Sequence, residues 1–217
     1  FRTVQEYQNY RKENANIKDV PLVLQNPKYP NGCESASAVM LLNYVGISIT
    51  LDDFIENYLE KDTVYEKDGV RYGPDPSKVY AGDPSSETRG WGTFEPVIAE
   101  SVNKILDNYH KKNEIFLKIS ASNKMPLYFL AAYEYPVVIW VTMDYQESDS
   151  VYNWFSADYK FTYTYPKNSH TVVLTGMDED FYYINDPLKE EKNIPIPKEQ
   201  LESSFNSMGR QFISFEK

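Results

Sequence analysis

Residues 25–46 read Gln25-Asn-Pro-Lys-Tyr-Pro-Asn-Gly-Cys33-Glu-Ser-Ala-Ser-Ala-Val-Met-Leu-Leu-Asn-Tyr-Val-Gly46 and hold the single cysteine of the 217-residue chain. Two prolines and an Asn-Gly pair disfavour helix before Cys33. After it, no proline or glycine occurs until Gly46, and the residues are apolar on nearly every side. We therefore predict a buried helix with Cys33 in its first turn and Gly46 just past its end.

A cysteine in the first turn of a helix is favoured as a thiolate, because unpaired backbone N–H groups and the helix dipole stabilise negative charge there. We expect Cys33 to be unusually reactive for this reason. A thiolate at a helix start is the nucleophile of cysteine peptidases and transglutaminases. The alternative is that Cys33 is a small buried hydrophobe, so a partnering histidine elsewhere decides between the two interpretations.

The composition excludes several classes of protein. Hydrophobic residues at 41% and charged residues at 25% are ordinary globular values. A net charge of −10 without a basic cluster argues against nucleic acid as the main partner. No apolar run approaches the roughly 18 residues of a membrane span. One cysteine and two histidines, His110 and His170, show no metal-ligand spacing, so we expect no metal and no cofactor.

The length suits one large domain. We predict a polar extension over residues 1–19, a single domain over residues 20–217, and an edge strand over residues 20–24. Two long excursions without clear periodicity, residues 62–93 and 144–169, are rich in tyrosine and tryptophan. Loops of this length are usually functional, so these rings either contact an extended peptide or simply pack the loops onto the domain.

A hairpin is predicted where His170-Thr-Val-Val-Leu-Thr-Gly176 and Phe181-Tyr-Tyr-Ile-Asn185 are joined by Met-Asp-Glu-Asp. A loop centred at residue 178 places His170 opposite Asp186, and a loop centred at 179 shifts the partner by about two residues. In either register His170 and Asp186 lie at the same open end of adjacent strands. A carboxylate there can orient the imidazole.

Nucleophilic catalysis by cysteine requires a base and a group that fixes the tautomer of that base. Cys33 precedes His170 by 137 residues, and Asp186 follows His170 by 16. This order fits the spacing of papain-like enzymes. Gln25 lies eight residues before Cys33. Its side-chain amide and the Cys33 backbone N–H are candidate donors to an oxyanion.

These segments together resemble a known family. Gln25, Asn31-Gly-Cys-Glu-Ser35, the apolar helix ending Asn-Tyr-Val-Gly46, His170-Thr-Val-Val-Leu-Thr-Gly176 and Tyr183-Ile-Asn-Asp-Pro-Leu188 are similar to the standalone C39-type cysteine peptidases, relatives of bacteriocin-leader peptidases. Tyr80-Ala-Gly-Asp-Pro84 and Gly90-Trp-Gly-Thr-Phe94 also fit their pattern. The leader-processing members carry an Asp-Cys-Gly type box, whereas this chain has Gly-Cys-Glu-Ser, so the resemblance does not imply a double-glycine specificity.

The resemblance implies an α+β, papain-like fold whose buried N-terminal helix carries the cysteine and packs on an antiparallel sheet carrying the histidine and aspartate. It implies Cys33 as nucleophile, His170 as base, Asp186 as orienting group and Gln25 as oxyanion donor. We expect a monomer that acts on a peptide or protein and is exported to the exterior or surface of a bacterium. Two alternatives are peptidoglycan amide hydrolysis or transglutamination with the same residues, and a non-catalytic peptide-binding module.

Overall fold

The computed structural model describes residues 17–113, 118–121, 125–131, 135–148 and 150–216. The predicted polar extension therefore lies mostly outside the described residues. Its last part already joins the fold, because the Ile17 backbone N–H donates to Thr175 O at 2.6 Å and the Ile17 side chain packs against the core.

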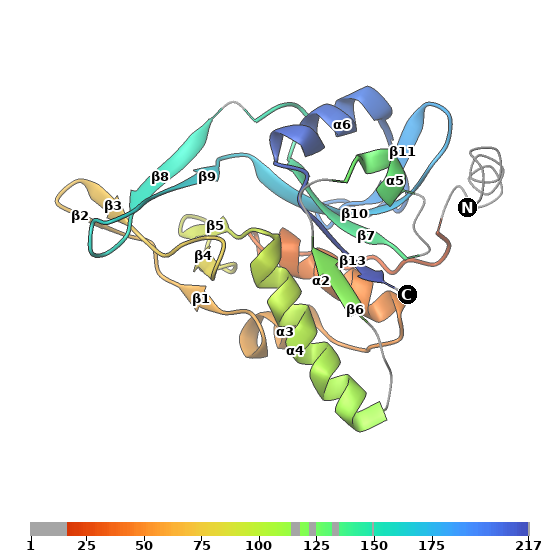
Figure 1. Ribbon diagram of the computed structural model, residues 1–217, viewed down its shortest axis with the longest axis horizontal. Helices are drawn as coiled ribbons and strands as arrows, with labels where there is room; N and C mark the ends of the chain where they lie inside the picture. Colours follow the sequence, from red (N-terminus) through yellow and green to blue (C-terminus); the bar gives the residue numbers. More distant parts are fainter. Residues whose placement is uncertain (1–16, 114–117, 122–124, 132–134, 149, 217) are drawn as a thin grey trace.

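Runs of consecutive strands are interspersed with helices along the chain (Figure 1). The helices are α2 (Cys33–Tyr44), α3 (Leu51–Asn57), α4 (Glu95–Asn113), α5 (Leu127–Leu130) and α6 (Lys198–Ser207). The first strands are β1 (Lys61–Asp62), β2 (Tyr65–Lys67), β3 (Val70–Tyr72), β4 (Tyr80–Gly82), β5 (Gly90–Gly92) and β6 (Lys118–Ala121). They are followed by β7 (Val137–Thr142), β8 (Val151–Phe155), β9 (Thr162–Pro166), β10 (Ser169–Met177), β11 (Phe181–Asn185), β12 (Ile194–Pro197) and β13 (Phe212–Glu216).

A six-stranded sheet forms the centre of the fold, with strand order β12-β11-β10-β7-β13-β6 and antiparallel pairing throughout. Helices α2, α3 and α4 cover one face, and α5 and α6 cover the other (Figure 1). Strand β7 is buried at every position and divides its side chains by alternation. Val138 and Trp140 face the α2 side, and Val137, Ile139 and Val141 face the α6 side.

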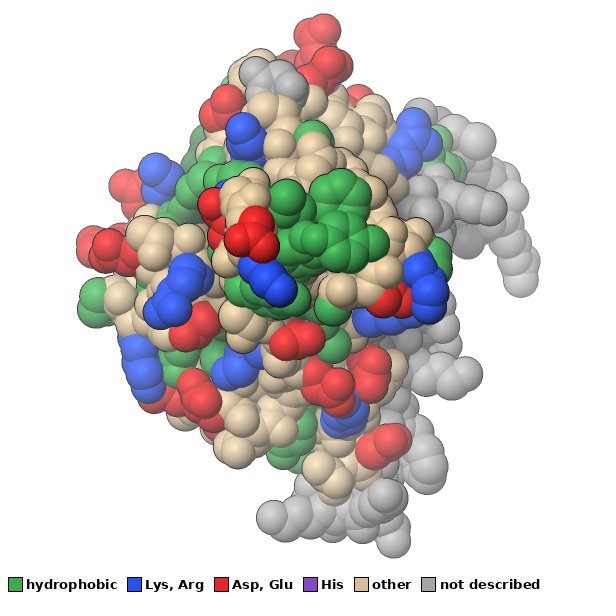
Figure 2. All heavy atoms as spheres, turned by 90° about the vertical axis from the view of Figure 1, so that its left-hand side faces the viewer, with side chains coloured by type: hydrophobic (Ala, Val, Ile, Leu, Met, Phe, Trp, Pro, Cys, Tyr) green, Lys and Arg blue, Asp and Glu red, His purple; other side chains and the backbone are tan. Residues whose placement is uncertain are grey.

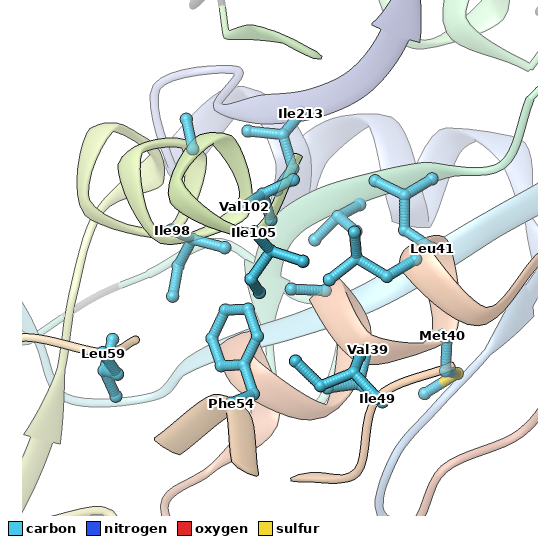
Figure 3. Close-up of a cluster of buried hydrophobic side chains, with 14 of the residues drawn as sticks. Val39, Met40, Leu41, Ile49, Phe54, Leu59, Ile98, Val102, Ile105 and Ile213 are labelled. Carbon is cyan, nitrogen blue, oxygen red and sulfur yellow. The ribbon is translucent and has the colours of Figure 1, made fainter. Parts of the chain in front are cut away.

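Helix α2 lies at the centre of the hydrophobic core on its face of the central sheet. Its first ten residues are all buried, which explains why its apolar residues show no preferred face. Val39, Met40 and Leu41 pack among side chains from α3, α4 and β13 (Figure 3). Ser37 is attached to β10, because its hydroxyl donates to Thr171 O at 3.1 Å. The predicted arrangement of a buried cysteine-bearing helix on an antiparallel sheet is confirmed.

The two excursions, in contrast, are not loops without regular structure. Parts of both pair into an outer sheet of order β2-β3-β8-β9, in which β3 and β8 run parallel and Tyr72 pairs with Phe155. A smaller sheet of order β1-β4-β5 lies between the outer sheet and α2 (Figure 1). Figure 2 views the end of the molecule formed by the outer sheet, where hydrophobic side chains gather. The exposed aromatic residues of this sheet and its turn are Tyr65, Phe155, Tyr159 and Phe161.

The predicted edge strand over residues 20–24 is wrong, because no strand forms there. Pro21 lacks an N–H for a ladder. The segment is held instead by single contacts with the end of β11. The Asn185 side-chain amide donates to Val20 O at 3.3 Å, and the Gln25 backbone N–H donates to Pro187 O at 3.1 Å. These contacts carry Gln25 to the same end of the sheet as Asp186.

Candidate active site

Helix α2 begins at Cys33, directly after Gly32. The preceding turns pack too closely for a side chain at Gly32, since a Cβ there would lie 2.8 Å from Tyr29 Cβ. Asn31 anchors this entry to the β4–β5 region. Its backbone O accepts from the Tyr80 hydroxyl at 2.6 Å, and its side-chain amide donates to Ser86 O at 2.7 Å. The close packing at Gly32 and the hydrogen bonds of Asn31 thus fix the backbone where α2 and Cys33 begin.

Cys33 is 9% exposed, and its thiol donates to the Glu34 carboxylate, with Sγ 3.3 Å from Oε2. Burial and this carboxylate raise the pKa of the Cys33 thiol well above its ordinary value, and hydrogen bonding from Thr171 of β10 opposes them only in part. This direction is opposite to the one predicted from the helix dipole. Desolvation and a neighbouring negative charge outweigh a dipole worth about 0.3–1 kcal/mol at a surface.

His170 and Asp186 meet as a buried pair, with His170 Nε2 2.8 Å from Asp186 Oδ1. His170 is in β10, and Asp186 directly follows β11. The pairing register is the second of the two predicted, since Val173 pairs with Asn185. A bulge lies between Leu174 and Gly176. The side chains still meet, and the chain turns directly after β11, where the Lys189 backbone N–H donates to Asp186 O at 3.0 Å.

Asp186 has two further hydrogen-bond donors. The Tyr145 hydroxyl donates to Oδ2 at 2.6 Å, and the Leu188 backbone N–H donates to Oδ1 at 2.8 Å. Burial acts to raise the pKa of Asp186, but these bonds and the hydrogen bond and charge of His170 outweigh it and hold the pKa below its ordinary value. Asp186 is therefore suited to remain ionised and to fix the His170 ring, leaving Nδ1 as the nitrogen that can accept a proton.

Gln25 is buried beside the start of α2. Its Nε2 donates to Pro30 O at 2.6 Å, and among the described residues its Oε1 has no hydrogen-bond partner. An amide nitrogen carries two hydrogens, so one remains for a ligand. This is compatible with the predicted oxyanion donor.

A cavity of about 350 Å³ brings most of the predicted residues together. Gln25, Cys33 and His170 line it, whereas Asp186 is not in the lining and supports His170 from behind. Both excursions contribute walls, as predicted for at least the end of the second one. The other lining residues are Pro30, Asn31, Glu34, Glu87, Thr88, Gly90, Trp91, Met143, Tyr152, Lys167, Ser169 and Leu188.

Neither Glu34 nor Tyr145 is among the site residues predicted from the sequence. A single acidic residue inside an otherwise apolar buried helix is a signal that could have singled out Glu34. No spacing indicates Tyr145, since it reaches Asp186 from a turn 41 residues away. His110 lies in α4, and its side chain is outside the described part. Within that part, no group of three or more His, Cys, Asp or Glu side chains is arranged to hold a metal ion, and no helix is long and apolar enough to cross a membrane.

Helix, sheet and cavity together define a papain-like α+β fold of the peptidase type. Residues 17–213 match the model of the Peptidase C39 like family, and the chain belongs to that family. The uncharacterised protein YvpB of Bacillus subtilis (strain 168) is 24% identical over 220 residues, which cover 96% of this chain and 80% of YvpB.

Two solved structures are similar in fold. A protein of Bacillus anthracis assigned as a C39-like peptidase superimposes with a TM-score of 0.78 at 25% identity, covering 94% of this chain and 97% of that one. The peptidase domain of Streptococcus ComA, a bifunctional ABC transporter of a quorum-sensing pathway, has a TM-score of 0.52 at 15% identity and covers 91% and 98% of the two chains.

Proposed function

We propose that this chain is a cysteine peptidase that hydrolyses peptide bonds through Cys33, His170 and Asp186. The observation that supports this most is that Cys33 and His170 line one cavity, with His170 Nε2 held by a buried carboxylate at 2.8 Å. A base fixed in this way has its second ring nitrogen available for the thiol proton. Membership of a peptidase family supports the same activity.

In the proposed reaction the Cys33 thiol gives its proton to His170 Nδ1, and Sγ forms a bond to the peptide carbonyl carbon. The carbonyl oxygen becomes an oxyanion that accepts from the Cys33 backbone N–H and the Gln25 amide. The C–N bond then breaks, and the leaving amine takes the proton from His170. Water attacks the resulting thioester and gives a proton to His170. The C–S bond breaks, the acid product leaves and the thiol is restored.

The cavity walls favour a peptide. Trp91 and Tyr152 offer aromatic surface with hydrogen-bonding groups. Glu87 contributes an exposed carboxylate, while the Lys167 ammonium lies 5.5 Å from the Tyr152 ring. With a net charge of −10, we expect a preference for flexible peptides with basic or small residues near the scissile bond over acidic ones. A clear preference for acidic peptides would contradict this part of the proposal.

Profiling of a mixed peptide library by mass spectrometry tests the activity. We expect cleavage by the wild-type chain and none by Cys33→Ala or His170→Ala. Gln25→Ala should lower kcat by about 10²–10³-fold if its amide binds the oxyanion. A primary amine in the same assay separates hydrolysis from acyl transfer to an amine. Cleavage that survives Cys33→Ala would sink the proposal, and tight peptide binding without cleavage would favour a non-catalytic module.

A further inference from the structure

The Glu34 carboxylate is buried beside the nucleophile and is fully engaged by neutral donors. Its Oε2 accepts from Cys33 Sγ at 3.3 Å. Its Oε1 accepts from the Thr93 backbone N–H at 3.0 Å and from the Tyr165 hydroxyl at 3.3 Å. Glu34 is 2% exposed, and Thr93 and Tyr165 are buried as well. A carboxylate is rarely this deeply buried unless it is paired with hydrogen-bond donors or cations.

The surroundings are shaped to admit this carboxylate. Gly92 has a φ of +127°, and a Cβ there would lie 2.6 Å from Glu34 Oε1 and 2.2 Å from the Tyr165 hydroxyl oxygen. The Tyr165 hydroxyl is also 3.1 Å from Ser169 Oγ, the residue before His170. We call Glu34, Cys33, Thr93 and Tyr165 the Glu34 cluster. It joins the nucleophile helix to the strand that leads to the base.

Several titratable groups face the carboxylate from the elements packed around it. Cys33 is on its own helix, Tyr80 lies on β4 and Tyr165 on β9. In the tyrosines, burial and then the charge of Glu34 hold the pKa of each hydroxyl well above its ordinary value, so both stay neutral. His170, Lys167 and Glu87 share the cavity wall with Glu34.

We propose that Glu34 is a positioning residue of the proposed peptidase site, whose ionised carboxylate accepts the thiol hydrogen of Cys33 and holds the nucleophile in a protonated resting form. The inference rests on the proposed function for its biological meaning. A thiolate at Cys33 would face this carboxylate across the 3.3 Å contact in a desolvated setting, where like charges repel most strongly. Loss of the charge on Glu34, by protonation or substitution, therefore makes the thiolate easier to form.

Alkylation of Cys33 by iodoacetamide tests the proposal, because it measures the thiolate without any peptide. The chain has one cysteine, so labelling is site-specific. Rates are measured from about pH 5 to about pH 10 for the wild type and Glu34→Gln. We expect the midpoint to fall by about one pH unit or more in Glu34→Gln, giving about tenfold faster labelling below both midpoints. An unchanged or raised midpoint would overturn the proposal.

Glu202→Gln is the matched control. Glu202 also accepts from a buried tyrosine, with the Tyr182 hydroxyl 2.5 Å from Oε1, but it lies on α6 at the other face of the central sheet. It should label as the wild type does. A peptidase assay that fails while the Glu34→Gln shift is present would contradict only the proposed function.

A second measurement does not depend on the folding of Glu34→Gln. In Cys33→Ala the carboxylate loses the thiol donor, which lowers the pKa of Glu34 in the wild type against the larger effect of burial. An NMR titration of the Glu34 carboxyl carbon should therefore give a higher pKa in Cys33→Ala than in the wild type. An identical pKa in the two proteins would mean that the contact does not form in solution, and would also overturn the proposal.

Discussion

Two buried carboxylates each contact one residue of the proposed catalytic pair, and their surroundings are alike in kind. Asp186 accepts from a backbone N–H, a tyrosine hydroxyl and His170. Glu34 accepts from a backbone N–H, a tyrosine hydroxyl and Cys33. Each is 2% exposed. Yet the pKa of Asp186 is below its ordinary value and that of Glu34 is above it.

Part of the difference lies in what the third donor can become. An imidazole can carry a positive charge, and the charge of His170 helps to lower the pKa of Asp186 against the opposing effect of burial. A thiol can only be neutral or negative, so Cys33 offers Glu34 a weak hydrogen bond that does not outweigh burial. Two otherwise similar sets of donors thus favour the charged carboxylate beside His170 and leave it disfavoured beside Cys33.

The largest effect expected from breaking this pattern is on turnover. Asp186→Asn should lower kcat by about 10²–10⁴-fold, because the amide cannot stabilise a positive His170 ring or fix the same tautomer. Some activity should remain, since Asp186 only orients the base. Glu34→Gln should lower kcat less than Asp186→Asn does, because Glu34 contacts the Cys33 thiol and does not contact the base. Steady-state kinetics on one peptide compares the two, and equal losses would mean that both carboxylates support the base.

Gly92→Ala should disrupt the contacts of Glu34 and leave those of Asp186 intact. The new Cβ would collide with Glu34 Oε1 and the Tyr165 hydroxyl, in addition to the strain of φ +127°. Gly46→Ala is the matched control, because Gly46 also has a positive φ, +84°, but nothing lies within 4 Å of its Cβ position. Urea unfolding should show Gly92→Ala less stable than Gly46→Ala by about 1–3 kcal/mol. Equal losses of unfolding free energy in the two variants would mean that backbone strain, and not the collision with Glu34 and Tyr165, destabilises Gly92→Ala.

The two carboxylates should also respond oppositely to pH. The lowered pKa of Asp186 gives stability that is present above the unfolded value near 3.8 and is lost as pH falls through the folded pKa. The raised pKa of Glu34 gives stability that is present below 4.5 and is lost as pH rises through the folded pKa.

At neutral pH, Asp186→Asn should therefore lower Tm and Glu34→Gln should raise it, by about 2–4 °C for each kcal/mol. The Asp186→Asn difference should shrink as pH falls below about 3.8, and the Glu34→Gln difference should shrink earlier, as pH falls through the raised folded pKa towards 4.5. Thermal unfolding by circular dichroism at neutral and acid pH measures this. A shift of the same sign in both variants would contradict the opposite pKa directions.

The smallest effects should come from removing one hydroxyl from each carboxylate. Tyr145→Phe and Tyr165→Phe should each reduce the free energy of unfolding by about 1 kcal/mol. The loss should be larger for Tyr165, whose side chain is more deeply buried and whose hydroxyl also contacts Ser169 Oγ. Urea titrations of the two variants rank their free energies of unfolding. A larger loss in Tyr145→Phe would show that the contacts of Asp186 depend more on their tyrosine than those of Glu34 do.

The predicted elements that proved correct are those with a strong local pattern. Helix α2 follows from apolar residues between Gly32 and Gly46, and the β10–β11 hairpin follows from two β-rich runs joined by a short turn. The pairing of His170 with Asp186 follows from hairpin geometry, and its tolerance to a two-residue shift explains why the bulged register did not matter.

The features that could not be predicted depend on partners far away in the sequence. Strand β3 is short, and its Tyr72 pairs with Phe155 of β8 across 83 residues, so the pairing of the two excursions with each other has no local signal. Glu34 raises the pKa of Cys33 because both side chains are buried beneath residues of the β5 and β9 regions, and this burial has no signal in the sequence of the helix. The start of the helix, and with it the helix dipole, can be predicted from the sequence alone. The dipole therefore indicated the wrong direction for the thiol pKa.

Strand β13 has a consequence for the order in which the molecule can be completed during synthesis. It pairs with β7 on one side and β6 on the other, so residues 212–216 occupy an interior position of the central sheet. Val138 and Ile139 of β7 lack this neighbour until those residues are available. Helix α2 and strand β10 are synthesised before β13, and the central sheet on which they pack is complete only when β13 has inserted between β7 and β6. A nascent chain that ends before β13 therefore lacks the complete scaffold of its candidate active site.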